Sequence, residues 1–450
     1  MESREKIIMV ITIVIALLLT PIVFDSVWAT PVPDTGQTKC YDNTQEITCP
    51  QPGEPFYGQD AQYITNPQSY KKLDASGNDL PDDATEWVMV RDNVTGLIWE
   101  NKTDDGSIHD KDNYYNWYDA QDVFIATINS QNFGGHSDWR LPMVKELPTI
   151  VDSSIYCPGP AINIGYFSNT ISNYYWSSTT HVSNPSYAWE IFFLDGYVTT
   201  YLRSYNYYVR AVRGGQCGSF GNYIDNEDGT ITDTDTGLMW QKDTAPSIYT
   251  WENALHYCDT LTLAEYNDWR LPNRNELQSL VDYNSDHPSI NTTFFPNTVS
   301  SYGYWSSTTH TSNLYVAWFV DFRVGSVGMG WNKYYTSLYV RAVRGSGVDS
   351  DHDGIFNDGD ISGTPGDNPC SGGQTLNCDD NCPTTPNSDQ LDSFPPQGNG
   401  IGDACDCEAN FDCDQDVDAV DVTKFLEDFG RSQYNNPCPM CVAGDWCSYN

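Results

Sequence analysis

Asp138-Trp-Arg-Leu-Pro142 occurs a second time, without a change, at residues 268–272. Three further blocks recur around it in the same order. They are Thr-Gly-Leu-Ile-Trp at 95–99 with Thr-Gly-Leu-Met-Trp at 236–240, Tyr-Trp-Ser-Ser-Thr-Thr-His at 175–181 and 304–310, and Tyr-Val-Arg-Ala-Val-Arg-Gly at 208–214 and 339–345. The copies are about 130 to 140 residues apart, which is the size of a domain rather than of a solenoid repeat. The middle of the chain is therefore predicted to hold two copies of one globular domain.

Each copy is expected to begin with a β-hairpin. In the first copy, residues 87–91 lead through Asp92-Asn93 to residues 95–99. In the second copy, Asp228-Gly229 is a common turn dipeptide, and residues 230–232 and 238–240 flank it as strands.

Helices are expected next, because apolar residues recur with helical spacing over 117–128 and over 251–257, where Thr250 is a candidate N-cap. Asn273 followed by Glu276 resembles a capping box and predicts another helix after the Trp-Arg-Leu-Pro block. The rest of each copy is rich in Tyr, Trp, Thr and Val, which is typical of strands. An α+β domain is therefore predicted.

The charged residues inside the repeated blocks are predicted to be structural. Arg140 and Arg270 are expected to form partly buried ion pairs with Glu146 and Glu276. His181 and His310 each follow a Ser-Ser-Thr-Thr run, and no carboxylate in the sequence is placed to orient either one as a base. The chain is therefore not expected to be an enzyme.

Tyrosines just before the last strand of each copy are the candidate ligand-binding residues. Tyrosine rings can stack on sugar rings and also offer a polar hydroxyl. The predicted ligand contacts are Tyr205 and Tyr207 in the first copy, and Tyr334 and Tyr335 in the second.

These same blocks resemble the Lcl C-terminal-like domain, a family of secreted bacterial modules named after the end of a collagen-like adhesin. The resemblance covers roughly residues 85–214 and 223–345. It implies a C-type lectin-like fold and attachment to an extracellular or surface partner, with glycans and proteins as the ligand classes. The blocks are also similar to the formylglycine-generating group, which implies the alternative of an enzyme or enzyme-accessory protein. A purely structural surface-layer protein is a third reading.

The charge of the chain excludes one class of partner. The 450 residues carry a formal net charge of −39. Phosphate backbones would be repelled, so no nucleic-acid partner is expected, whereas divalent cations would be attracted.

The first 29 residues read as a signal peptide. Arg4 and Lys6 precede a short apolar run, and Val27-Trp28-Ala29 fits a cleavage site. No later segment is apolar enough to span a bilayer, so the mature chain is expected to have no transmembrane segment and to be secreted or held at the cell surface. Export also favours disulfides over zinc for the 14 cysteines, and Cys40 with Cys49 is predicted to form a local bridge.

Residues 349–360 have the spacing of an EF-hand-type calcium loop. Side-chain oxygens fall at loop positions 1, 3, 5, 9 and 12, and Gly354 stands at position 6. The predicted calcium ligands are Asp349, Asp351, Asp353, Asn357 and Asp360.

Further calcium sites are predicted beyond that loop. Residues 380–406 resemble a thrombospondin type 3 repeat, in which calcium and disulfides replace a hydrophobic core. Residues 410–421 resemble a dockerin half-repeat, although Gln415 stands where glycine is expected. The predicted ligands in this loop are Asn410, Asp412, Asp414, Asp416, Asp418 and Asp421.

The predicted organisation is two tandem C-type lectin-like domains followed by a small tail stabilised by calcium and disulfides. Its segments are a signal peptide (1–29), an N-terminal extension (30–84), a first domain (85–216), a second domain (217–345), thrombospondin type 3-like repeats (346–406) and a dockerin-like, cysteine-rich tail (407–450). Because whole motifs repeat, the two domains are expected to fold independently when the chain is cut near Gly218.

Overall fold

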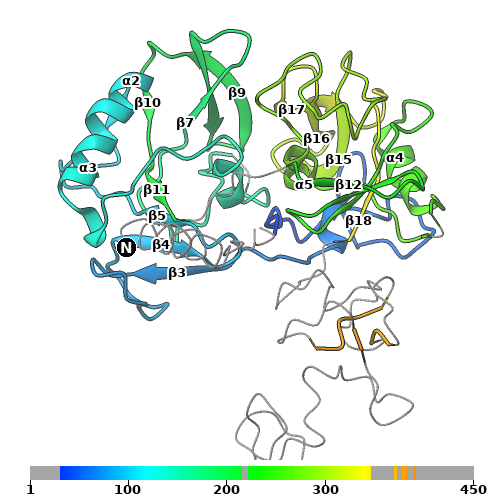
Figure 1. The fold of residues 1–450 in the computed structure, drawn as a ribbon, viewed down its shortest axis with the longest axis horizontal. Coiled ribbons are helices and arrows are strands. Elements are labelled where there is room, and N and C mark those ends of the chain that lie inside the picture. The colour runs from blue at the N-terminus through cyan, green and yellow to red at the C-terminus, as the bar shows by residue number, and fades with distance from the viewer. Residues whose placement is uncertain are drawn as a thin grey trace, which may run out of the picture.

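The computed structural model describes residues 31–155, 157–214, 221–264, 266–345, 369–371, 378–382 and 390–391. Both predicted calcium loops, 349–360 and 410–421, lie outside the described residues, as does the predicted signal peptide. Within the described tail residues, Cys370 and Cys378 form a disulfide. Figure 1 shows two lobes side by side, which we call the first module (70–214) and the second module (221–345).

Each module contains a small antiparallel sheet of four strands. In the first module these are β3 (Tyr70–Leu73), β4 (Met89–Asp92), β5 (Ile98–Glu100) and β11 (Val212–Arg213), in the order β11-β5-β4-β3. In the second module they are β12 (Tyr223–Asp225), β13 (Thr230–Asp233), β14 (Met239–Gln241) and β18 (Val343–Arg344), in that order.

The predicted hairpin of the first module is confirmed, because β4 pairs antiparallel with β5. The turn predicted for the second module was misplaced. Asp228 and Gly229 lie in the turn between β12 and β13, whereas β13 reaches β14 through Thr234–Gly237. The sequence reading missed β12 and β3, and β3 falls inside the predicted N-terminal extension although it pairs with β4.

The predicted helices are present, with one exception. The first module has a continuous helical segment, α2 (Trp117–Asp119), η2 (Ala120–Ile125) and α3 (Ala126–Ser130), in which η2 is a π-helix. The second module has α4 (Trp251–Asp259) after Thr250, and α5 (Arg274–Ser279) with the predicted capping box. The first module has only a 3-10 turn, η4 (Leu147–Ile150), where α5 would be, because Pro148 has no N–H for a helical hydrogen bond. Two further 3-10 turns are η1 (Asp60–Gln62) and η3 (Phe133–Gly135).

One eight-stranded sheet runs through both modules. The first module supplies β6 (Tyr114–Tyr115), β7 (Tyr174–Thr180), β8 (Tyr187–Phe192), β9 (Tyr197–Leu202) and β10 (Tyr207–Tyr208). The second supplies β15 (Tyr304–Thr309), β16 (Val316–Asp321) and β17 (Ser326–Asn332). Their order is β15-β16-β17-β9-β8-β7-β10-β6.

The modules join at equivalent positions. Val198 of β9 pairs with Val327 of β17 in antiparallel register, and each valine comes two residues after a repeated glycine, Gly196 or Gly325. Both valines belong to a single buried core that draws residues from both modules. The pairing therefore relates the modules by an approximate two-fold axis.

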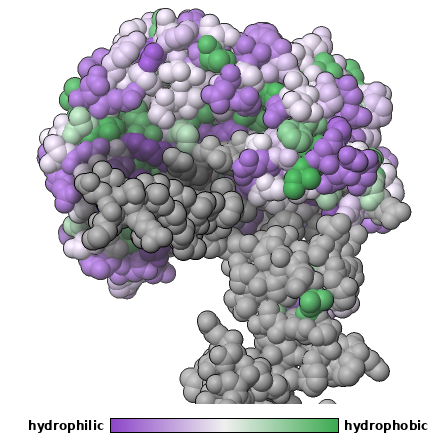
Figure 2. Space-filling model, in the orientation of Figure 1, coloured by the Kyte–Doolittle hydropathy of each residue, from purple (hydrophilic) through white to green (hydrophobic). Residues whose placement is uncertain are grey.

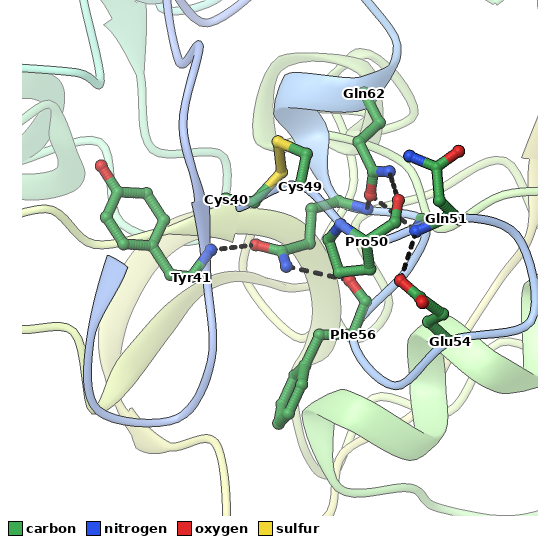
Figure 3. Close-up of a disulfide and its surroundings, with 10 residues drawn as sticks. Cys40, Tyr41, Cys49, Pro50, Gln51, Glu54, Phe56 and Gln62 are labelled. Carbon is green, nitrogen blue, oxygen red and sulfur yellow. Dashed lines mark hydrogen bonds between the residues drawn. A yellow bond between two sulfur atoms is a disulfide. The ribbon is translucent and has the colours of Figure 1, made fainter. Parts of the chain in front are cut away.

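The chain before β3 contacts both modules: the Ser153 N–H of the first module donates to the carbonyl of Thr35 at 2.7 Å, and several side-chain hydrogen bonds join this segment to the second module. We call residues 31–66 the strap; it contains β1 (Cys40–Tyr41), β2 (Glu46–Ile47) and η1, closed by the predicted Cys40–Cys49 disulfide. Figure 3 shows how this loop is braced: Tyr41 N–H donates to the side chain of Gln59, and Gln62 donates to the carbonyl of Pro50.

Strand β15 of the second module is bonded to the strap at successive residues. Thr308 Oγ donates to Asp60, and Thr309 exchanges two hydrogen bonds with the Gln37 side chain, at 2.9 and 3.0 Å. Asn275 of α5 donates to the carbonyl of Pro33 at 3.0 Å. A cut near Gly218 would separate the second module from the strap and from β9, so independent folding of the two pieces stays a prediction that needs a measurement.

Candidate functional site

The repeated arginine–glutamate pairs are structural, as predicted. Arg140 forms two parallel hydrogen bonds with Glu146, both 2.6 Å, and Arg270 forms the same pair with Glu276 at 2.6 and 2.7 Å. Each glutamate also accepts from a backbone N–H three residues earlier, on Met143 or Asn273. These bidentate pairs anchor the start of α5 and the equivalent turn of the first module to their sheets.

The two repeated histidines lie in different surroundings. His181 stacks on Trp189, with ring centroids 5.9 Å apart. His310 is buried against Trp318, and its Nε2 lies 3.9 Å from Asp195 Oδ2 of the other module. Sequence reasoning missed this carboxylate, because Asp195 reaches His310 only through the contact between modules. Neither ring nitrogen of His310 has a hydrogen-bond partner among the described residues, so none of their hydroxyls or thiols is held there as a nucleophile.

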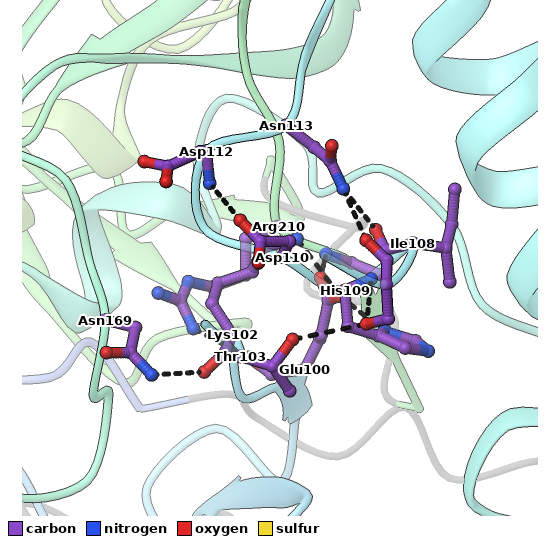
Figure 4. A network of polar contacts seen from close by, with 12 residues as sticks. Glu100, Lys102, Thr103, Ile108, His109, Asp110, Asp112, Asn113, Asn169 and Arg210 are labelled. Carbon is purple, nitrogen blue, oxygen red and sulfur yellow. Dashed lines mark hydrogen bonds and ion pairs between the residues drawn. The ribbon is translucent and has the colours of Figure 1, made fainter. Parts of the chain in front are cut away.

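A buried polar network supports the loop between β5 and β6 (Figure 4). Glu100 lies between Lys102 at 3.2 Å and His109 at 2.8 Å. Although burial opposes ionisation, Lys102 and His109 hold the pKa of Glu100 below its ordinary value. Glu100 also accepts from the Ala211 N–H, and Gln241 does the same for Ala342 in the second module.

The same loop gathers three carboxylates. Oxygens of Asp104, Asp110 and Asp112 lie within 4.8 Å of one another. Asp110, however, already accepts hydrogen bonds from three backbone N–H groups of the loop, and Lys111 pairs with Asp104. The cluster therefore closes the loop by internal contacts.

The predicted ligand-binding tyrosines fall into two separate groups. Tyr334 and Tyr335 form an edge-to-face pair after β17, with centroids 4.9 Å apart, and they are 62% and 83% exposed. Tyr205 and Tyr207 instead lie on the first module, on either side of Tyr201. The ring centroid of Tyr201 is 4.7 Å from that of Tyr205 and 5.7 Å from that of Tyr207. The structure thus brings Tyr205 and Tyr207 together and leaves the other two as a pair of their own.

Several more aromatic rings complete the first group. Tyr207 also contacts Tyr174 at 5.3 Å and Trp176 at 4.9 Å, and Tyr174 stacks on Phe192 at 4.3 Å. We call this group the tyrosine face; it consists of Tyr174, Trp176, Phe192, Tyr201, Tyr205 and Tyr207.

Glu190 lies within the tyrosine face and was missed by the sequence reading. It is the fourth residue of β8, pairs with Trp176 on one side and Thr199 on the other, and is 1% exposed. Burial raises its pKa to about 8. A comparison of the two copies could have pointed to Glu190, because the equivalent residue of the second module is an apolar one, Phe319.

The surface of the two modules shows no single dominant apolar area on the side drawn in Figure 2, where hydrophilic and pale residues are interspersed with small hydrophobic groups. In the described part of the chain, no helix has the length and apolar character needed to cross a membrane.

The duplicated fold, the paired arginines and the exposed tyrosines define a protein built from two β-rich modules of one type. The family model of the Lcl C-terminal domain matches residues 88–213 and 229–344, which is more than half of the chain. The chain belongs to the Lcl C-terminal domain family and carries two tandem copies of that domain. This domain suggests a surface or secreted protein. No curated protein matches the sequence.

Proposed function

We propose that this is a non-enzymatic binding protein of the cell surface or the extracellular space, with C-type lectin-like modules that recognise a glycan or protein ligand. The main support is the contrast between its charged and its aromatic residues. The repeated arginines and glutamates bond to each other inside the protein, whereas tyrosines remain exposed near the last strand of each module. Exposed aromatic rings with polar tips are suited to stacking on sugars.

An enzyme on the same scaffold is less well supported. General acid–base or nucleophilic chemistry needs a base within hydrogen-bond reach of a nucleophile. His310 has a carboxylate at 3.9 Å but no hydrogen-bonded hydroxyl or thiol among the described residues. The proposal of a binding role therefore stands ahead of the enzymatic one.

Replacing Tyr334 and Tyr335 together by alanine is expected to weaken ligand binding by about tenfold or more, because it removes one of two linked binding surfaces and with it their avidity. Their exposure means that the fold should survive. Binding is measured on a glycan array with the full chain, and the matched control is Tyr302→Ala, which removes a different tyrosine that is 57% exposed. Unfolding of the double variant, or an unchanged array pattern, would contradict a ligand-binding role for this pair.

Calcium is proposed as the cofactor of the acidic tail. Five aspartates within residues 349–360 repel one another, and a bound calcium ion would offset that charge. Calorimetry of the full chain is expected to show calcium uptake, and Asp351→Ala with Asp353→Ala should reduce it. Chelation should also expose the region after Ser346 to protease while the modules stay folded.

The acidic cluster of the first module supplies the control for that experiment. Asp104→Ala with Asp112→Ala removes two carboxylates at a place where the third is already saturated by backbone N–H groups. This variant should take up calcium like the unmodified chain. Absence of any calcium uptake by the unmodified chain would leave the tail as an acidic linker.

A further inference from the structure

Glu190 is buried among aromatic side chains on one face of the sheet. Across the three central strands of the first module, Trp176, Glu190 and Thr199 stand in one row, so they share one face of the sheet. Tyr174 is two residues from Trp176 on β7, and Tyr201 is two residues from Thr199 on β9, which places both on the same face. Tyr207 touches Trp176, Tyr174 and Tyr201 and so spans this row.

One oxygen of the Glu190 carboxyl group is buried without a hydrogen-bond partner among the described residues. That oxygen is Oε2, and no ion pair among the described residues includes the carboxyl group. A buried carboxyl group without a donor costs free energy that well-packed apolar residues would not. The arrangement therefore leaves an interaction to be made by something outside the protein.

The second module has no such group. Phe319 occupies the equivalent strand position and pairs across to Gly328 of β17, where the first module has Glu190 opposite Thr199. Phenylalanine is a common residue at half-buried strand positions, because its ring packs against the neighbouring side chains. The glutamate is thus a feature of the first module alone, and the fold does not require it.

We propose that the tyrosine face of the first module binds a small organic cation, an alkylammonium group, with the tyrosine rings around it and Glu190 as its counter-charge. This proposal rests on the proposed function, in which the modules bind ligands through tyrosines, and names the chemistry of one site. Cations are attracted to the faces of aromatic rings and to a carboxylate that has no other partner. The net charge of −39 favours the approach of cations to the whole molecule.

Two tyrosines form the exposed edge of the site. Tyr201 and Tyr205 are 38% and 48% exposed, and they contact each other. A neutral sugar stacked on the same rings would leave the carboxyl group without a counter-charge, and the experiment below separates the two ligands.

The proposal predicts a pH dependence with a defined sign. Burial raises the pKa of Glu190 to about 8, so the cation must displace a proton below that pH. The titratable groups that face Glu190 are Tyr174, Tyr201 and Tyr207 from β7, β9 and β10, and the pKa of each tyrosine is raised, so they stay neutral near pH 7. The helical segment 117–130 packs beside this face through Trp117 and Phe124, and the charged group at this contact is Arg203, whose guanidinium lies over the Trp117 ring at 3.6 Å. Affinity should rise up to about tenfold per pH unit as the pH approaches 8 and level off above it.

Choline is the probe, because its charge does not change with pH, and 3,3-dimethyl-1-butanol is its uncharged isostere. Calorimetric titration of the full chain is expected to show choline binding at least tenfold tighter than the isostere. Glu190→Gln keeps the shape of the side chain and should abolish the pH dependence and weaken choline binding at least fivefold, leaving only the preference that the aromatic rings give. The matched control, Tyr302→Ala in the second module, removes an exposed tyrosine outside both groups and should leave choline binding unchanged.

Each outcome has a distinct meaning. Equal binding of choline and its isostere, or unchanged choline affinity in Glu190→Gln, would overturn the cation site. Binding of N-acetylglucosamine without choline binding would also overturn it, while the proposed binding function of the modules would stand. If Glu190→Gln misfolds, Tyr201→Ala tests the same site, because this exposed ring contributes to the cation–aromatic contact and its loss should weaken choline binding by at least fivefold.

Discussion

Residues 221–345 expressed alone are expected to show no cooperative melting transition, whereas residues 31–345 should unfold in a single step. The isolated second module loses the strap, which bonds β15 through Asp60 and Gln37 and covers Trp251 with Phe56. It also loses its sheet partner β9 and exposes its share of the common core. Calorimetry of both proteins measures the difference.

A fusion of the strap to the second module provides the control. Adding residues 31–66 through a flexible linker to residues 221–345 should restore part of the transition, because the strap contacts return but the β9 edge does not. An isolated 221–345 that melts within a few degrees of the intact pair would show that the modules are independent after all.

Arg270→Met is expected to destabilise the pair of modules by about 3–5 kcal/mol, since it leaves the buried carboxylate of Glu276 without its counter-charge. The side chains of Arg270 and Glu276 are only 6% and 4% exposed. Arg140→Met removes the equivalent bond in the first module, where Glu146 is buried but the arginine is 33% exposed, so water can reach the carboxylate in its place and a smaller loss of about 1–2 kcal/mol is expected. Urea denaturation of residues 31–345 measures both free energies of unfolding.

The repeat makes these two variants controls for each other. A double variant, Arg270→Met with Glu276→Leu, should recover much of the loss because the buried carboxylate of Glu276 is removed together with its partner. Equal destabilisation by Arg270→Met and Arg140→Met would mean that burial of the pair does not set its strength.

The motifs that repeat could be read from the sequence because each carries its own local signal. Asn273 and Glu276 predicted a capping box, and the structure has it. The strap could not be read in this way. Its bonds join Gln37 to Thr309 and Asp60 to Thr308, pairs some 250 to 270 residues apart in sequence, and no local pattern marks such partners. Strand β3 was missed for a related reason, because the family motifs begin only after it.

The candidate site was predictable in part. Tyr205 and Tyr207 were found by their place before the last strand, and the structure groups them on one face. Glu190 escaped notice because one acidic residue in an otherwise apolar strand carries no motif. Its meaning comes from its neighbours across the sheet, Trp176 and Thr199, and from Phe319 at the same place in the second module.

The pairing of Val198 with Val327 bears on how this molecule arose. An interface in which a residue meets its own equivalent is the arrangement of a symmetric homodimer, and a tandem duplication would place both partners in one polypeptide. In a homodimer any mutation appears on both sides at once. Within one polypeptide each half mutates separately, and one can specialise while the other keeps the ancestral packing. Glu190 opposite Phe319 is the kind of difference that such freedom permits.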